Sequence, residues 1–344
     1  MNSITLAAPA KVNLFLKVLN KRKDSYHNIL TLFERISLAD TVTVSKAPRG
    51  ISVFSDRPIT ARPADNIAYK AAELILKRAG VKEGVKIRIK KRIPIAAGLG
   101  GGSSDAAAVL SGINRLFGLD INKGRLMRLG AELGADVPFF LFNAPFAIGK
   151  SRGDRLEALN IGRKFWHILV YPGFKVATKD VYRAFDASAS LSINPEHSRR
   201  VDFALTLRQR SGSSAEFLSS TVVRHAHHPS KHPELSRGKL LSKCLTRKYG
   251  DDKMAFPKDW DRLGDLIHND LGAVVVRKRP VIGKVIKCLV SSLDKKTIVS
   301  GSGPSVFCLY RTRKEAIRAR RRLSRSVPAA SRRGWQVFIV GTQS

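Results

Sequence analysis

Four glycines lie within five residues, between a segment that predicts a strand and one that predicts a helix. They are Gly98, Gly100, Gly101 and Gly102, and the residues Ser103, Ser104 and Asp105 follow them. Glycine tolerates positive φ and lets a ligand approach the backbone closely. A helix N-terminus presents free N–H groups and the positive end of a dipole, so it suits an anion and above all a phosphate. We therefore interpret residues 94–104 as a nucleotide phosphate-binding loop.

The loop matches neither of two common phosphate-binding patterns. It contains no G-x-x-x-x-G-K-[ST] sequence, and Ser103 stands where the pattern G-x-G-x-x-G needs its last glycine. The alternative is a glycine-rich turn in solvent. We disfavour it because Ser103, Ser104 and Asp105 are good N-cap residues for a helix predicted over 103–117.

Lys11 and Asn13 lie in an apolar segment, residues 4–19, that predicts a strand. Because they are two residues apart, their side chains should share one face of that strand. On pattern alone, an edge strand with solvent-facing polar residues explains them best. Asp136 is a lone carboxylate within Gly-Ala-Asp-Val-Pro-Phe. It is either a helix N-cap or a functional acid, because burying an unpaired charge is costly.

Two further features could contact a ligand. Tyr26 and His27 follow a polar turn at 21–25. A Tyr-His pair could stack on a base and hydrogen-bond to it, although alone it is more often a surface turn with a half-buried ring. Gly301-Ser-Gly-Pro304 separates predicted strands at 296–300 and 305–310. This pattern predicts a hairpin whose small residues allow close backbone approach, or simply a tight turn.

The remaining elements are short strands mixed with helices. Strands are predicted at 41–45, 51–55, 85–92, 146–149, 167–171 and 334–340. Helices are predicted at 67–79, from about 122 to 133, and at 178–185, 261–268, 280–293 and 313–326. Ala64-Asp65-Asn66 should cap the helix at 67–79, and Gly80 should end it. Residues 187–258 differ, because they are polar and contain five of the eight histidines, so we interpret them as an insertion.

The composition is strongly basic, with 62 Lys and Arg against 27 Asp and Glu in 344 residues, a net charge of +35. Such a charge raises the possibility of a nucleic-acid partner, but charge alone speaks to solubility and association, not to fold. The three cysteines show no metal-ligand or disulfide spacing, which favours a reducing cytoplasm. Neither a signal peptide nor an apolar run of about 18 residues is found, so we expect no membrane contact.

Three motifs occur in order along the chain. They are Pro9-Ala-Lys-Val-Asn-Leu14, the loop from Pro94 to Ser104, and Ser300-Gly-Ser-Gly-Pro304. Together they resemble the GHMP kinase superfamily. The resemblance implies an α+β fold with two domains, the first like domain 2 of ribosomal protein S5 and the second ferredoxin-like. The expected domains are 1–160 and 161–344, with the insertion at about 187–258 in the second.

Within that superfamily the chain is most similar to the branch that phosphorylates a cytidyl diphosphate substrate in the non-mevalonate isoprenoid pathway. Ala10-Lys-Val-Asn-Leu, the Tyr26-His27 pair and the extended Gly-Gly-Gly-Ser-Ser-Asp loop carry this similarity, together with Gly134-Ala-Asp-Val-Pro-Phe. The resemblance implies ATP and Mg²⁺ as cofactors. It also implies Asp136 and Lys11 as catalytic residues, because a lysine keeps a nearby acid ionised and offsets charge on the transferred group.

The resemblance assigns binding roles to further residues. The implied ATP-binding residues are Pro94, Gly98, Leu99, Gly100, Gly101, Gly102, Ser103 and Ser104. The implied substrate-binding residues are Asn13, Tyr26, His27 and Tyr182. No residue is assigned as a metal ligand, and Ser104 is the residue expected near the Mg²⁺.

The sequence therefore predicts a cytoplasmic, ATP-dependent kinase acting on an alcohol, as a monomer or homodimer. One alternative is a GHMP kinase for a different small alcohol, which the Tyr26-His27 pair disfavours. Another is a nucleic-acid-binding protein on an S5-like fold, suggested by the charge of +35. Nucleic acid is the weaker prediction, because an RNA-binding protein does not need the loop together with Lys11 and Asp136.

Overall fold

The computed structural model describes residues 1–191 and 267–343. By their contacts the residues fall into two compact units, one of residues 1–182 with 249–344 and one of residues 183–248. Of the second unit only residues 183–191 are described, and they form the end of α5 (Thr178–Leu191). The paragraphs below concern the first unit.

A seven-stranded sheet is built around one long antiparallel hairpin, β1 (Ser3–Lys21) with β2 (His27–Ala47). Its main order is β3-β4-β2-β1-β8, with β3 (Ile51–Ser55), β4 (Gly84–Lys90) and β8 (His268–Asn269). β5 (Phe146–Lys150) pairs with β2 and with β6 (Arg155–Ala158). Residues 10–16 of β1 are buried at every position, so side chains on both faces of this stretch lie inside the protein.

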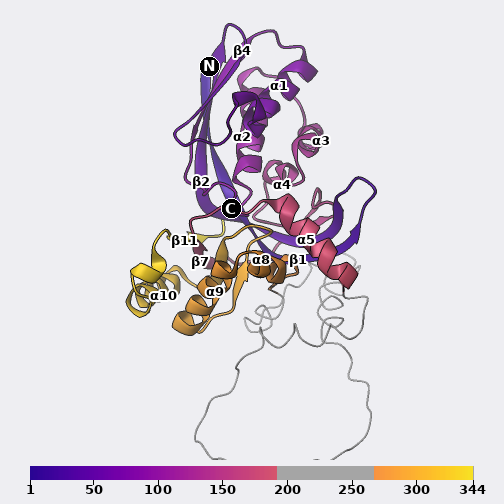
Figure 1. Cartoon of the computed structure of the whole chain (residues 1–344). Coiled ribbons are helices and arrows are strands. Elements are labelled where there is room, and N and C mark those ends of the chain that lie inside the picture. The colour runs from indigo at the N-terminus through magenta and orange to yellow at the C-terminus, as the bar shows by residue number, and fades with distance from the viewer. Residues whose placement is uncertain (192–266, 344) are drawn as a thin grey trace, which may run out of the picture. The chain divides into compact units, whose positions relative to one another are not determined.

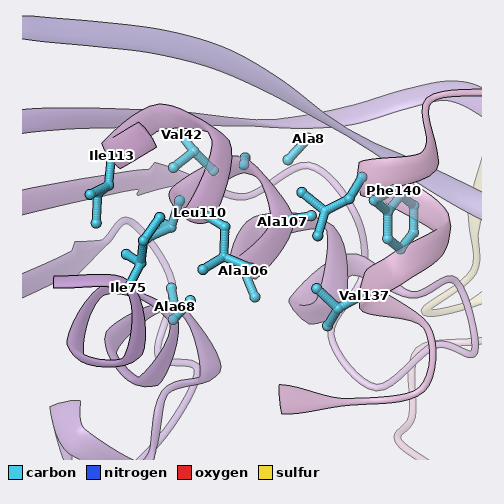
Figure 2. Close-up of a cluster of buried hydrophobic side chains, with 14 of the residues drawn as sticks. Ala8, Val42, Ala68, Ile75, Ala106, Ala107, Leu110, Ile113, Val137 and Phe140 are labelled. Carbon is cyan, nitrogen blue, oxygen red and sulfur yellow. The ribbon is translucent and has the colours of Figure 1, made fainter. Parts of the chain in front are cut away.

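Four helices belong to this sheet: α1 (Ile67–Ala79), α2 (Gly101–Leu116), α3 (Lys123–Leu133) and the short α4 (Val137–Phe142). A short 3-10 helix, η1 (Pro63–Asp65), precedes α1. Figure 1 shows α1, α2 and α3 together alongside β2 and β4. α2 is the central helix, because its alanine-rich face lets it pack closely on β1, β2 and α1. Figure 2 shows Ala106, Leu110 and Ile113 of α2 directed toward Ile75 of α1 and Val42 of β2.

A second sheet contains four antiparallel strands in the order β11-β7-β10-β9. They are β7 (Trp166–Tyr171), β9 (Thr297–Val299), β10 (Val306–Tyr310) and β11 (Gln336–Gly341). The associated helices are α8 (Leu271–Lys278), α9 (Pro280–Leu293), α10 (Arg313–Ser326) and the 3-10 helix η4 (Ala330–Arg332). The sequence β7-α9-β9-β10-α10-β11 with spatial order 4-1-3-2 is the ferredoxin-like arrangement, as expected.

Buried polar groups join the two sheets. Thr342, after β11, forms an isolated bridge with Ile36 of β2 and donates a 2.6 Å hydrogen bond to Glu34 Oε1. Glu34 Oε2 lies 2.9 Å from His167 Nε2 of β7, and neither side chain is exposed. The two sheets are therefore linked through the protein interior.

Several local predictions are confirmed. α1 has the predicted bounds, the Asn66 side chain accepts from Ala68 N, and Gly80 ends the helix at φ +67°. α9 and α10 also have the predicted bounds. The predicted hairpin at 296–310 forms, with β9 antiparallel to β10.

Other predictions are wrong in a helix cap or in the bounds of an element. α2 begins at Gly101 with Gly100 as its N-cap, and no side chain caps it. Ser103, Ser104 and Asp105 therefore lie within the helix. The strand predicted at 41–45 is the end of the long β2, which continues through a register shift at residues 36–39. The helix predicted at 178–185 continues to Leu191, into the segment that we interpreted as an insertion.

Two more differences concern residues at the margin of the described regions. The helix predicted at 261–268 lies mostly outside the described residues, and its last residue, His268, forms strand β8. The rest of the predicted insertion, from residue 192 on, also lies outside them. The predicted boundary at 160 falls between β6 of the first sheet and β7 of the second, but β8 returns to pair with β1.

Candidate functional site

Lys11 and Asp136 come together although 125 positions separate them in the sequence. Lys11 Nζ lies 3.5 Å from Asp136 Oδ2. The lysine side chain is 6% exposed and the aspartate side chain 35% exposed. Asp136 occupies the N-cap position of α4, but its side chain makes no capping hydrogen bond. The carboxylate is thus paired with a buried cation and still accessible, which argues against the N-cap interpretation.

A chain of hydrogen bonds through Asn13 and Thr31 holds the Lys11 side chain in position. Lys11 Nζ donates to Asn13 Oδ1 at 2.7 Å, and Asn13 Nδ2 donates to Thr31 Oγ1 at 2.8 Å. Thr31 in turn donates to the Phe15 carbonyl oxygen at 2.7 Å. Lys11 and Asn13 are 4% and 1% exposed, so the edge-strand interpretation of these residues is wrong. The pairing of β1 with β2, and the packing on the other side of β1, bury both side chains.

The two glycine-rich turns pack backbone against backbone. Gly98 has φ +79°, and a Cβ there would lie 2.3 Å from the Ser300 carbonyl oxygen. A Cβ on Gly303 would lie 2.1 Å from Gly98 N. The Ser300 hydroxyl donates to the Gly98 carbonyl oxygen at 3.2 Å. Only glycine fits at these two positions, so the second turn fixes the shape of the first.

The glycine-rich loop lies against Lys11. Lys11 N donates to the Leu99 carbonyl oxygen at 3.0 Å, which ties the loop to β1. A Cβ on Gly301 would lie 3.1 Å from Asn13 Oδ1 and 3.4 Å from Lys11 Nζ. One on Gly100 would lie 3.1 Å from Lys11 Cγ. Both glycine-rich turns therefore border the amino group that faces Asp136.

The start of α2 has the features of an anion site. The first hydrogen bond of the helix is donated by Ser104 N to the Gly100 carbonyl oxygen at 2.9 Å. The N–H groups of Gly101, Gly102 and Ser103 precede that bond, so they have no partner within the helix. Gly102 is exposed and Gly101 and Ser103 are half-buried, whereas the side chains of Pro94 and Leu99 are buried. The glycines and the helix terminus are thus available to a phosphate, and Pro94 and Leu99 pack in the interior.

A buried ionic triad supports the same loop, and sequence reasoning missed it. Lys91 Nζ lies 2.5 Å from Asp40 Oδ2 and 2.7 Å from Asp105 Oδ2, and all three side chains are at most 3% exposed. Asp40 Oδ1 also accepts from the backbone N–H groups of Arg92 and Ile93 at 2.5 and 2.8 Å. The triad connects β2, the residues that lead into the loop, and the second turn of α2.

Charge and burial set the ionisation of the triad. Burial raises the pKa of Asp105 to about 7, against the opposing effect of Lys91. Burial alone would lower the pKa of Lys91, but the two carboxylates raise it above its usual value. Asp105 Oδ1 has no hydrogen-bond partner among the described residues. Lys91 therefore remains charged, and Asp105 titrates near neutral pH.

The aromatic residues divide into two groups. His27 stacks on Tyr182, with ring centroids 5.0 Å apart and ring planes inclined by 24°. Burial and then the charges of Asp136 and Asp270 raise the pKa of Tyr182 well above its usual value, which places this ring in the electrostatic field of Asp136. Tyr26 is 48% exposed, and its ring lies 5.0 Å from the Arg152 guanidinium. The structure thus brings His27 and Tyr182 together and leaves Tyr26, the neighbour of His27 in the chain, accessible.

Two other supporting residues could not be found from local pattern. Thr31 looks like an ordinary strand residue, and only its partner Asn13 shows its part in the site. The Asn269 amide donates to the carbonyl oxygens of Val299 and Gly301 at 2.8 and 2.7 Å, so it holds the second glycine-rich turn. The sequence signal for Asn269 was weak, because it lies beside the residues at 261–268 for which we predicted a helix.

Comparison with known proteins defines the class. The model of the GHMP kinases N terminal domain matches residues 66–144, and that of the GHMP kinases C terminal domain matches residues 245–329. A relative from Syntrophus aciditrophicus is 33% identical over 98% of this chain and 98% of its own length. The chain belongs to the GHMP kinase family and is a kinase by class.

The relatives also carry a more specific name. The protein from Syntrophus aciditrophicus and one from Geobacter metallireducens are both called 4-diphosphocytidyl-2-C-methyl-D-erythritol kinase. The latter is 34% identical over 92% of each chain. A solved structure of 4-(cytidine 5'-diphospho)-2C-methyl-D-erythritol kinase is 29% identical, with a TM-score of 0.63 over 99% of this chain and 100% of its own. The chain is therefore similar to this kinase along nearly its whole length.

Proposed function

We propose that this protein transfers the γ-phosphoryl group of ATP to the 2-hydroxyl of 4-diphosphocytidyl-2-C-methyl-D-erythritol, in the non-mevalonate pathway to isoprenoid precursors. The observation that carries the proposal is the Lys11–Asp136 pair at 3.5 Å beside two interlocked glycine-rich turns. Relatives of that name, matched over nearly the full length of the chain, support the choice of substrate. In bonds, the substrate oxygen joins the γ-phosphorus, the bond from that phosphorus to the bridging oxygen breaks, and ADP leaves.

Asp136 and Lys11 have complementary roles in this proposal. Asp136 accepts the proton of the substrate hydroxyl, because its carboxylate is accessible and makes no capping bond. Lys11 keeps that carboxylate ionised and offsets the charge on the transferred phosphoryl group. Asn13 orients Lys11 through its 2.7 Å hydrogen bond and would also contact the substrate.

ATP would bind with its phosphates at residues 98–104. The free N–H groups at the start of α2 suit them, and the backbone contact of Gly98 with Ser300 and Gly303 holds the loop in place. Mg²⁺ would accompany the phosphates and supply further charge neutralisation. Among residues 1–191 and 267–343 no group of three His, Cys, Asp or Glu side chains could hold a metal. Mg²⁺ prefers oxygen ligands, and the accessible carboxylate of Asp136 would help to hold such an ion beside the phosphates.

The cytosine ring would stack on Tyr26, beside His27 and Tyr182. Tyr26 is accessible, and Arg152 lies over its ring. A base on the other face of Tyr26 would gain roughly 1–3 kcal/mol from stacking. In the structure His27 and Tyr182 stack on one another, so we propose that they form the wall beside the base and contact its edge.

The decisive experiment measures ADP release with Mg²⁺ and ATP in the presence of the cytidyl substrate, homoserine or mevalonate. We expect turnover with the cytidyl substrate alone. Turnover only with another alcohol would keep the class of kinase and reject the substrate. A folded protein without turnover on any of the three, which binds RNA in a strongly salt-dependent manner, would favour the nucleic-acid alternative.

A substitution at Tyr26 tests the substrate assignment independently. Tyr26→Ala should raise the KM for the cytidyl substrate by roughly tenfold with little change in the KM for ATP, because the cytosine loses the ring on which it stacks. Tyr26→Phe should stay near wild type. Phe54→Ala is a matched control, since Phe54 is similarly exposed at 54% and lies in β3. A change confined to the KM for ATP would reject the role of Tyr26.

No helix among the described residues is long and apolar enough to cross a membrane. A cytoplasmic location remains our prediction from cysteine usage. A monomer or homodimer also remains a prediction. Cys288 and Cys308 are free cysteines.

A further inference from the structure

A cavity lies beside the proposed phosphate loop and, of the residues assigned to ATP and the cytidyl substrate, has only Ser104 in its wall. It encloses about 390 Å³ between the start of β1, one side of α2, and residues of α3 and α4. Lys11, Asn13, Asp136 and the aromatic residues of the proposed substrate site do not line it. Ser104 is the one residue of the proposed phosphate loop in its wall. The cavity therefore needs an explanation of its own.

The charge that lines this cavity has one sign. Arg35, Arg115 and Lys123 contribute three cationic groups, and no Asp or Glu is among the lining residues. Arg115 and Lys123 are exposed and so lie at the mouth, whereas Arg35 is 6% exposed and lies inside. Such an arrangement attracts an anion from solvent toward a buried cation.

Arg35 is a buried cation with only neutral partners. Its guanidinium donates to Asn143 Oδ1 at 2.6 Å and to the Phe140 carbonyl oxygen at 3.2 Å, which ties it to the end of α4. Its Nε is buried without a hydrogen-bond partner among the described residues. Burial lowers the pKa of Arg35, as expected for a cation without a nearby carboxylate. An oxyanion in the cavity would supply the missing counter-charge.

Ser104 gives a second, independent indication. Its side chain is 1% exposed, and its Oγ has no hydrogen-bond partner among the described residues. A buried hydroxyl without a partner costs free energy, and this one lies in the wall of the same cavity as Arg35. It is therefore in position to donate to the ligand that Arg35 attracts.

The other walls define the rest of the ligand. Leu6, Ala107, Leu126 and Leu141 contribute apolar surface, and Ser111 and Asn114 contribute polar groups. Three cations without an acid favour a dianion over a monoanion, and the apolar wall favours a small hydrocarbon body. We propose that this cavity binds a small phosphate monoester with an apolar body, at a site separate from those of ATP and the cytidyl substrate.

The test is calorimetric titration of n-butyl phosphate into the full chain, with the ATP site filled by Mg²⁺ and the non-hydrolysable analogue β,γ-imido-ATP. We expect one bound molecule per chain in the presence of the analogue. Inorganic phosphate should bind more weakly because it lacks the apolar body, and n-butanol should not bind because it lacks the charge. Absence of binding once the analogue fills the ATP site would overturn the proposal.

Charge-reversed variants separate the cavity from the general basic charge. Lys123→Glu should weaken n-butyl phosphate binding by roughly tenfold or more, because the reversed charge lies at the mouth. Arg125→Glu is the matched control, since Arg125 is exposed in the same turn of α3 and does not line the cavity. Equal weakening in both variants would mean non-specific attraction to a basic protein and would overturn the proposal.

A cavity-filling variant provides a second route. Ser111→Leu places a larger side chain at a half-buried lining position and should abolish binding without altering the KM for ATP. Thermal unfolding of the variant shows whether it is folded. Binding that persists in a folded Ser111→Leu protein would place n-butyl phosphate elsewhere and contradict the proposal.

Discussion

Two lysines lie beside the same glycine-rich loop, and they hold their carboxylate partners in opposite ways. Lys11 lies 3.5 Å from Asp136, whose side chain is 35% exposed. Lys91 lies 2.5 and 2.7 Å from Asp40 and Asp105, with all three side chains at most 3% exposed. The first pair is open to a ligand, whereas the second is closed.

This difference in exposure distinguishes a pair that can take part in the reaction from a triad that supports the structure. A general base must reach the proton that it accepts, so its carboxylate cannot be saturated by protein donors. Asp40, in contrast, accepts from Lys91 and from two backbone N–H groups, which leaves it no role toward a substrate. The open pair can act on ligands, and the closed triad can hold the loop that positions them.

The largest expected effect is at the open pair. Asp136→Asn should lower kcat by roughly 10²–10⁴-fold, the usual contribution of a general base, because the amide cannot accept the proton. Stability should fall by about 1–3 kcal/mol at most, since Asp136 makes no capping bond but its replacement leaves the buried Lys11 without its carboxylate. ADP release and urea unfolding measure the two quantities.

A suitable control for this substitution is Asp120→Asn, at an exposed residue with φ +49° that asparagine also tolerates. It should leave kcat unchanged. If Asp136→Asn retained near-wild-type kcat, Asp136 would have no catalytic role, and exposure would not distinguish the two lysine sites by function.

The second effect is on stability, at the closed triad. Lys91→Met should lower the free energy of unfolding by roughly 3–5 kcal/mol, because it leaves buried carboxylates without their cation. Lys90→Met is the matched control, since Lys90 is the exposed neighbour in β4, and it should change stability by less than about 0.5 kcal/mol. If both variants lost the same free energy of unfolding in urea, the burial of the triad would make no specific contribution to stability.

The same contrast explains what the sequence could predict. α1, α9 and α10 were predicted to their bounds because their signals are local: Asn66 and Gly80 around α1, Pro280 at the first turn of α9, and a basic run in α10. The glycine-rich loop before α2 was also recognisable, because four glycines in five residues stand together in the sequence.

The parts that failed depend on contacts between distant segments. The triad combines residues from β2, from the segment just after β4 and from α2, and each alone looks like a surface charge. Lys11 looked solvent-facing because nothing in its own segment shows that β2 and the loop carbonyl of Leu99 cover it. The start of α2 was misplaced because Gly100 takes the N-cap position at φ +68°, where serine would usually be expected.

A smaller effect tests how the open pair is held. Thr31→Val keeps the side-chain shape but removes the hydroxyl that accepts from Asn13 Nδ2 and donates to Phe15. The Asn13 amide would then lack a partner, so stability should fall by about 1–3 kcal/mol and kcat should fall several-fold as Lys11 loses its fixed position.

Thr43→Val serves as the comparison for Thr31→Val, because Thr43 is in the same strand and bonds only to Thr5 in an exposed pair. It should not change kcat. An unchanged kcat in Thr31→Val, despite lower stability, would show that Asn13 and Lys11 keep their geometry without this support.

The smallest effect is a pH dependence confined to the closed triad. Asp105 keeps its proton up to a pKa of about 7 in the folded protein, whereas its ordinary value is 3.8. Between these values the folded state binds more protons than the unfolded state, so the contribution of Asp105 to stability is complete below about pH 4 and is lost as pH rises through 7. Lowering the pH from 8 to 6 should therefore stabilise the wild type relative to Asp105→Asn by about 1 kcal/mol. Urea unfolding at both pH values measures this difference. Parallel curves for the two proteins would mean that Asp105 stays ionised beside Lys91, and the triad would then carry a net negative charge behind the phosphate loop.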